Sequence, residues 1–144
     1  MRIALGTDER TPLIAALRSC LETRGHEVLV VADATPWPAA GAAVGHAVAD
    51  GVAEVGVVCC TTGTGVSMAA NKVSGVRAAL CTDAETARGA RRWNDANVLA
   101  FGLRLTTEAM AAEMVDAFLE TAFDPAEAEL VASLEPVTSV RGSR

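Results

Sequence analysis

The chain has 144 residues, of which 51% are hydrophobic and 21% charged, and its formal net charge is −6. This length and balance fit one globular domain that can bury a real core. The negative charge, without any Lys/Arg-rich stripe, argues against a nucleic-acid or anionic-membrane partner. The apolar run at residues 3–6 turns polar at Thr7, too soon for a signal peptide or a membrane-spanning helix. We therefore expect a cytoplasmic protein whose partners are small solutes or other proteins.

The cysteines and histidines do not form a recognisable metal or disulfide pattern. The four cysteines show no Cys-x-x-Cys spacing, and they are Cys20, Cys59, Cys60 and Cys81. The two histidines, His26 and His46, lie far apart and have no companion ligands. Structural zinc needs clustered Cys and His ligands, and disulfide frameworks need paired cysteines in an oxidising compartment. We expect neither metal, disulfide nor cofactor.

Strands and helices alternate along the chain. The first strand is expected at residues 2–6 and the first helix at 12–24, where Thr11 can act as N-cap, Pro12 takes the first helical position and Gly25 ends the helix. Hydrophobic periodicity then predicts strands at 27–32, 54–60, 76–81 and 97–102. Residues 33–38 read as a Pro-containing loop. The further helices are expected at 40–49, 66–72, 84–92 and 107–122, the first of them weak because of its glycines.

This alternation predicts an α/β, three-layer Rossmann-like fold. The strands are continuous apolar runs without a polar face, as expected for a five-stranded parallel sheet covered by helices on both faces. We expect the flavodoxin-like strand order 2-1-3-4-5. Residues 1–123 would form this domain. Residues 124–144 would add an extra C-terminal helix, starting at Asp124 with Glu127 at the capping-box position and reaching about residue 134, and then a frayed tail. Such a terminal helix often packs on a partner subunit.

The most informative segment is the Gly-rich turn TTGTG that follows Cys60 and opens a helix. Several backbone N–H groups and the positive end of the helix dipole meet there, so the turn attracts an anion or a developing oxyanion. A thiol beside a helix N-terminus ionises more readily. In the expected topology, the first and third strands end in Asp8 and Cys60 on either side of the crevice where ligands bind. Carboxylate, thiol and turn should therefore share one pocket.

These groups suit proton abstraction from a carbon next to a carbonyl. A thiolate would be the base and backbone N–H groups would hold the enediolate oxygens, which are the parts that aldose–ketose isomerisation needs. A nucleophilic cysteine enzyme would want a histidine beside the thiol, and neither His26 nor His46 is obviously placed for that role. A redox pair at Cys59 and Cys60 is disfavoured, because adjacent strand residues point to opposite faces and a vicinal disulfide is strained.

The same residues resemble the family of type B ribose-5-phosphate isomerases and galactose-6-phosphate isomerase subunits. The opening strand and Asp8 resemble the family's Gly-x-Asp-His. The run VCCTTGTGVSMAANK at residues 58–72 is similar to its Cys-Gly-Thr-Gly-x-Gly-x-Ser-x-Ala-Ala-Asn-Lys motif. The segment from Asn94 to Arg104 matches the stretch that usually begins His-Asn-Asp.

The resemblance implies a homodimer or homotetramer whose active sites are shared between subunits, or a hetero-oligomer with a related chain. It implies that Cys60 moves the proton, that the turn holds the enediolate, that Asp8 binds substrate hydroxyls and that the Asn94 segment reaches in from the neighbour. The candidate catalytic residues are Cys60, Asp8 and Thr62. The candidate substrate-binding residues are Glu9, Arg10, Thr61, Gly63, Thr64, Gly65, Ser67, Asn71, Trp93, Asn94 and Arg104, the last matching an arginine associated with phosphate.

The chain departs from the family at several of these positions. Glu9 replaces a histidine, and Trp93 replaces the histidine that resembles the ring-opening acid–base; an indole cannot relay a proton at neutral pH. Thr61 replaces a glycine, and the C-terminal basic stretch is absent. A basic cluster, Arg88, Arg91 and Arg92, is either a solvated helix face or a relocated anion site. Trp37 is either a second pocket wall or only a fastener for its loop.

We expect an aldose–ketose isomerase for a sugar or sugar phosphate other than ribose 5-phosphate, working through a cysteine base and an enediolate. The alternative is a non-catalytic or sugar-binding subunit of the same fold that lacks the ring-opening and phosphate-binding groups. A sugar that exchanges the hydrogen beside its carbonyl in D₂O would favour the isomerase. Co-purification with a more complete homologous chain would favour the subunit.

Overall fold

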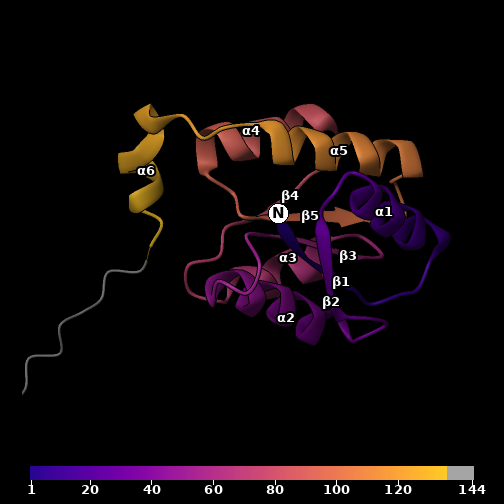
Figure 1. Ribbon diagram of the computed structural model, residues 1–144. Helices are drawn as coiled ribbons and strands as arrows, with labels where there is room; N and C mark the ends of the chain where they lie inside the picture. Colours follow the sequence, from indigo (N-terminus) through magenta and orange to yellow (C-terminus); the bar gives the residue numbers. More distant parts are fainter. Residues whose placement is uncertain (136–144) are drawn as a thin grey trace, which may run out of the picture.

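The computed structural model describes residues 1–135 and has one parallel sheet between two layers of helices. Helices α1, α4 and α5 cover one face, and α2 and α3 cover the other (Figure 1). The strands are β1 (Arg2–Thr7), β2 (Glu27–Ala32), β3 (Val55–Cys60), β4 (Ala78–Leu80) and β5 (Val98–Gly102). The helices of these layers are α1 (Pro12–Thr23), α2 (Trp37–Ala49), α3 (Thr64–Asn71), α4 (Ala84–Asn94) and α5 (Glu108–Glu120). The expected three-layer α/β fold is confirmed.

Local signals explain most element bounds. The Thr11 side chain accepts from Ile14 N with Pro12 at the first helical position, and the Asp83 and Thr107 side chains cap α4 and α5 in the same way. Two elements depart most from their predicted bounds. Helix α2 begins at Trp37, inside the predicted loop, because Pro38 falls in its first turn, where a missing N–H costs nothing. Strand β4 has three residues, half the predicted length.

The expected strand order was wrong at one edge. The observed order is β2-β1-β3-β5-β4, so β5 lies between β3 and β4. Crossover connections between parallel strands are right-handed. A right-handed crossover over one face of the sheet therefore shifts the chain in the opposite direction along the sheet from a crossover over the other face. Because α4 packs with α5, on the face away from α3, the step from β4 to β5 runs back toward the centre. The switch point between β1 and β3 is as expected.

The two faces of the sheet carry separate cores. Under α1, α4 and α5 lie the largest buried side chains, among them Phe101, Phe118 and Met114. The core under α2 and α3 is built from small residues such as Ala40, Val44 and Ala70. Backbones approach closely on this side: a Cβ on Gly41 would lie 2.6 Å from the carbonyl oxygen of Val66. This close packing holds α3, which begins at the Gly-rich turn.

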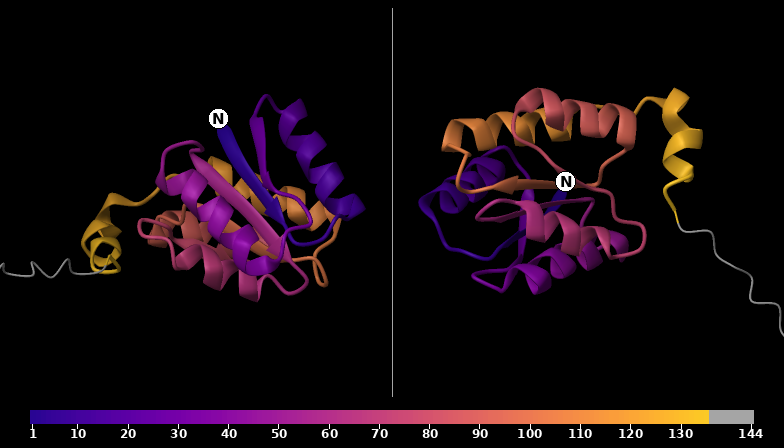
Figure 2. Two further views of the ribbon diagram at one scale, coloured as in Figure 1. Left: turned by 90° about the horizontal axis from the view of Figure 1, so that it is seen from below. Right: turned by 180° about the vertical axis from the view of Figure 1, so that it is seen from behind.

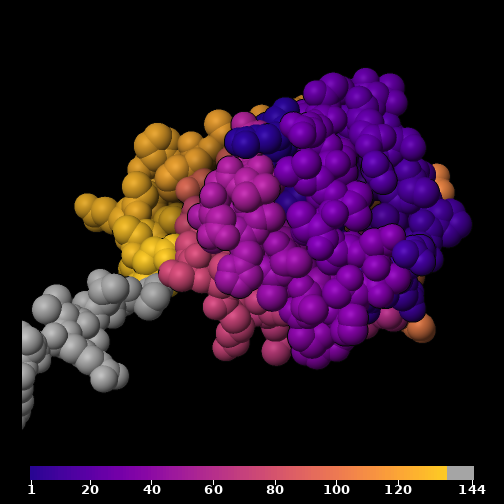
Figure 3. Space-filling model, turned by 60° about the horizontal axis from the view of Figure 1, so that its bottom comes forward, coloured from indigo at the N-terminus to yellow at the C-terminus, as the bar shows by residue number. Residues whose placement is uncertain are grey.

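The C-terminal segment stands apart from the body. It consists of a 3-10 turn, η1 (Pro125–Glu127), and a short helix, α6 (Ala128–Ala132), and neither has a buried residue. Figures 2 and 3 show it, in yellow, at one side of the molecule. The Asp124 side chain accepts from Ala126 N, as a helix start should, but α6 ends two residues earlier than expected. The predicted frayed tail lies outside the described residues. No helix of residues 1–135 has the length and hydropathy to cross a membrane.

Candidate active site at the carboxyl ends of β1 and β3

The Gly-rich turn between β3 and α3 is shaped by two glycines. Gly63 precedes α3 with φ of +78°, a conformation that favours glycine. A Cβ on Gly63 would lie 2.6 Å from the carbonyl carbon of Phe101, and one on Gly102 would lie 2.6 Å from the carbonyl oxygen of Thr62. The turn therefore rests directly on the end of β5. Leu103 N and Arg104 N donate to the carbonyls of Cys60 and Thr61 at 2.9 and 3.0 Å and fix that contact.

Cys60 ends β3 with its sulfur toward this turn. Its Sγ accepts a hydrogen bond from Gly63 N at 3.2 Å. The residue is 5% exposed and belongs to the core under α2 and α3, but it directly precedes the exposed Thr61 and Thr62. Thr64 begins α3 and is exposed, whereas Ser67, one turn further, is 9% exposed. The sulfur therefore sits behind the turn, close to its amide groups.

Cys59 points the other way, as strand alternation requires. It lies in the core under α1, α4 and α5, and its thiol approaches the carbonyl oxygen of Gly6 at 3.8 Å. Burial raises the pKa of Cys59 to about 12, with the hydrogen bond from Thr7 working in the opposite direction. A thiol so resistant to ionisation is a packing residue. The adjacent cysteines thus divide between core and candidate site, and the structure gives no support to a redox pair.

Asp8 lies beside Cys60 across the parallel ladder. Thr7 pairs with Cys59, and Asp8 N donates to the Cys59 carbonyl at 3.4 Å, so the next residues of the two strands are neighbours, about 5 Å apart. One carboxylate oxygen, Oδ1, is buried and has no hydrogen-bond partner among the described residues. Loss of solvent, and then the charge of Glu9, raise the pKa of Asp8. The backbone therefore brings the ends of β1 and β3 and the turn together, whereas the cavities beside α1 and beside Arg104 have neither Asp8 nor Cys60 in their lining.

A small cavity of about 110 Å³ lies on the other side of the turn. It is bounded by the ends of β4 and β5, and Arg104 lines it. Four threonines contribute hydroxyl groups, namely Thr61, Thr62, Thr82 and Thr106. One guanidinium and several hydroxyls are donors suited to an anion. Thr82 and Thr106 were missed from the sequence, because their place here depends on β5 lying next to β3.

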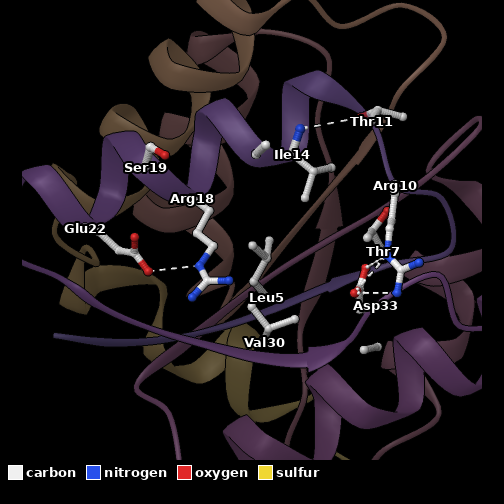
Figure 4. A pocket seen from close by; sticks show the side chains of 12 residues that line it. Leu5, Thr7, Arg10, Thr11, Ile14, Arg18, Ser19, Glu22, Val30 and Asp33 are labelled. Carbon is white, nitrogen blue, oxygen red and sulfur yellow. Dashed lines mark hydrogen bonds and ion pairs between the residues drawn. The ribbon is translucent and has the colours of Figure 1, made fainter.

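Arg10 does not belong to this group. Its guanidinium makes a two-pronged contact with Asp33, with Nε 3.0 Å from each carboxylate oxygen. Figure 4 shows this pair at one end of a cavity of about 440 Å³ between α1 and β2, which has Leu5 and Val30 at its floor. The sequence expected Arg10 at the mouth of the Cys60 pocket. In the structure Arg10 instead binds Asp33, in the loop after β2.

Trp93 and Asn94 lie far from Cys60 within one chain. They are the last residues of α4, which starts near the carboxyl end of β4 and returns to the amino edge of the sheet. The Trp93 ring lies against Gly89, where a Cβ would meet it at 2.8 Å. The predicted arginine cluster is dispersed as well: Arg88 pairs with Glu85, and Arg91 with Asp95. One chain alone therefore brings neither residue to the turn.

Asn71 also has a different place from the one expected. It ends α3, about 10 Å from the turn, and its amide both donates to the Ala78 carbonyl at 2.9 Å and accepts from Ala78 N at 2.8 Å. Both polar ends of this side chain are therefore used by β4. Trp37, by contrast, reaches the turn, since a Cβ on Gly65 would lie 2.8 Å from its ring. This contact supports the second alternative for Trp37, since the ring fastens the start of α2 to the turn.

The chemistry open to this arrangement is proton transfer assisted by main-chain donors. A sulfur, a carboxyl group and the amides at the start of α3 converge at one edge of the sheet. Within residues 1–135 no group of three or more His, Cys, Asp or Glu is placed to hold a metal ion.

Comparisons with known proteins agree with this fold and motif. The sequence profile described as Ribose/Galactose Isomerase matches residues 3–133. The chain is 39% identical over 130 residues to galactose-6-phosphate isomerase subunit LacB of Clostridium acetobutylicum, covering 87% of this chain and 75% of that one. It is 39% identical over 88 residues to D-erythrulose-4-phosphate isomerase of Pectobacterium atrosepticum, covering 61% and 58% of the two chains.

A solved structure covers nearly the whole chain. Ribose-5-phosphate isomerase B of Clostridium thermocellum superposes with a TM-score of 0.86 at 36% identity, covering 93% of this chain and 95% of that one. The chain belongs to the ribose/galactose isomerase family.

Proposed function

We propose that the chain is an aldose–ketose isomerase in which Cys60 moves a proton between adjacent sugar carbons. The main observation behind this proposal is the 3.2 Å hydrogen bond from Gly63 N to Cys60 Sγ, which places the start of α3 next to the sulfur. Hydrogen-bond donors at a helix N-terminus favour negative charge on sulfur and on the enediolate oxygen alike. Asp8 lies beside them to hold hydroxyl groups. Thr62 would add a hydroxyl at the exposed side of the turn.

A phosphate group would bind in the cavity beside Arg104. That cavity and Cys60 lie on opposite sides of the same turn, so a sugar that contacts Cys60 can place its far end there. The cavity is lined by threonines and one arginine, and the only charged side chains in the described part of the C-terminal segment are acidic. With Glu9 and Trp93 in place of family histidines, we expect a substrate other than ribose 5-phosphate.

Two chains would complete each site. Trp93 and Asn94 are exposed at the end of α4. A second copy, in a homodimer or homotetramer, would supply them to the neighbour's turn. The exposed Leu130 and Leu134 of the C-terminal segment offer an apolar surface for the same contact.

Deuterium exchange tests the reaction. Galactose 6-phosphate, ribose 5-phosphate and erythrulose 4-phosphate would each be incubated with the protein in D₂O, and exchange of the hydrogen beside the carbonyl followed by NMR. Cys60→Ser should abolish exchange, whereas the control Cys59→Ala should retain it, since that thiol faces the other core. Exchange that persists in Cys60→Ser would remove Cys60 as the base.

The second candidate is a non-catalytic subunit. It is favoured by the 5% exposure of Cys60 in the single chain and by the relative whose name describes a subunit. Purification from the native source would decide between the two. A homo-oligomer with turnover excludes the subunit, and a related chain that co-purifies and restores turnover supports it.

A further inference from the structure

The histidines of this chain lie at the wrong edge of the sheet for acid–base work beside Cys60. His26 lies between α1 and β2, and its Nδ1 is 3.3 Å from the N-terminal amine. His46 lies in the last turn of α2. Both positions are at the amino edge, because α1 and α2 each begin near the carboxyl edge and return. Within a single chain, proton transfer near Cys60 must therefore use other groups.

Two consecutive carboxyl groups are placed there, on Asp8 and Glu9. The Thr7 hydroxyl donates to the Glu9 carbonyl at 2.6 Å and accepts from Glu9 N at 3.2 Å, which closes a tight turn directly after β1. This turn holds Asp8 beside Cys60 and leaves Glu9 exposed. The buried Oδ1 of Asp8 has no partner among the described residues, so it is free to bond a substrate.

The charges around the two carboxyls separate their roles. The nearest cation, Arg10, is held by Asp33, and the remaining titratable neighbours are the thiols of Cys59 and Cys60. Loss of solvent and the Glu9 charge both raise the pKa of Asp8 above its ordinary value. A carboxyl group with one buried oxygen next to an exposed carboxyl group is a pair whose environments differ, as the environments of an acid and a base do.

We propose that Asp8 and Glu9 together open the ring of a cyclic aldose before Cys60 acts, an inference that rests on the proposed isomerase function. Aldoses with a free hydroxyl on C4 or C5, where the aldehyde carbon is C1, exist mainly as rings, and the carbonyl must be freed before isomerisation. Asp8 gives its proton to the ring oxygen as the bond from that oxygen to C1 breaks. Glu9 takes the proton of the anomeric hydroxyl as the C1 carbonyl forms. Exchange with water then returns both carboxyls to their starting states.

Ring opening can be measured without isomerisation. In Cys60→Ser the proposed base is lost, so the remaining acid–base groups should still interconvert the two anomers of galactose 6-phosphate carrying ¹³C at C1. Exchange NMR gives that rate directly. We expect Cys60→Ser to accelerate it over buffer, and Glu9→Gln or Asp8→Asn added to Cys60→Ser to lose about 100-fold or more of the acceleration. Glu27→Gln, an exposed glutamate at the amino edge, is the matched control and should lose nothing.

An acyclic substrate separates this role from general damage. Erythrulose 4-phosphate cannot close a ring, because its terminal oxygen carries the phosphate. Glu9→Gln with Cys60 intact should therefore slow turnover of galactose 6-phosphate far more than turnover of erythrulose 4-phosphate.

The results also separate the two proposals. Anomer exchange that Cys60→Ser does not accelerate, or that the added Glu9→Gln leaves unchanged, overturns the ring-opening role even if isomerisation is found. Accelerated exchange that depends on Glu9, with no deuterium exchange in the unaltered protein, supports ring opening and overturns the isomerase instead.

Discussion

Gly63→Ala would test how the Gly-rich turn is built. At φ of +78°, a Cβ on this residue would lie 2.6 Å from the Phe101 carbonyl carbon and 2.8 Å from Gly102 N. The left-handed conformation costs an alanine about 1–2 kcal/mol, and overlap with backbone that cannot rotate away adds about 1–3 kcal/mol. We therefore expect the free energy of unfolding to fall by about 2–5 kcal/mol, the sum of the two contributions.

Gly75→Ala is the matched control. Gly75 has nearly the same φ, +82°, but no heavy atom lies within 4 Å of the added Cβ. It should lose only the conformational part, about 1–2 kcal/mol. Urea denaturation followed by far-ultraviolet circular dichroism gives both values. If the two variants lose the same stability, the turn does not rest on the end of β5 as described.

Three further expectations follow from individual side chains. Asp8→Asn should be more stable than the unaltered chain at neutral pH. The raised pKa means that the folded state holds the Asp8 proton to higher pH than the unfolded state does. The stability contributed by Asp8 is therefore lost as pH rises from about 3.8 through the folded pKa. A difference in unfolding free energy between Asp8→Asn and the unaltered chain that does not change with pH would contradict this. Arg77→Ala, which removes contacts to Asp95 from a largely buried guanidinium, should cost about 1–3 kcal/mol, against about 0.3–0.5 kcal/mol for the exposed helical pair of Arg18. Iodoacetamide at pH 8 should label Cys20 but not Cys59, whose burial raises its pKa to about 12, as peptide mass spectrometry would show.

The sequence was sufficient for features that depend on neighbours along the chain or on strand pairing. Thr11 and Asp83 cap their helices because the side chain and its backbone partner are three residues apart. The nearness of Asp8 and Cys60 could also be predicted, because parallel strands end at one edge and the switch point was correctly located.

Features that depend on which face a helix covers were not predictable. The apolar pattern of α4 would suit either face of the sheet. The face that α4 covers nevertheless decides whether β5 lies between β3 and β4 or beyond β4. The same choice brings Thr106 and Arg104 beside the Gly-rich turn. Trp93 lies at the end of α4, away from its own chain's turn, and the motif that predicted its role gives its position in the chain but not the subunit whose turn it would reach.

Asn71 has a consequence for how the molecule avoids unwanted association. Strand β4 has a partner on one side only, and the free N–H and C=O on its outer side are those that a foreign strand would use to extend the sheet. The Asn71 amide satisfies both groups at Ala78, so one side chain imitates the peptide unit of a missing neighbour. Conservation of polarity at this position would then reflect protection against edge-to-edge aggregation, and not affinity for a sugar.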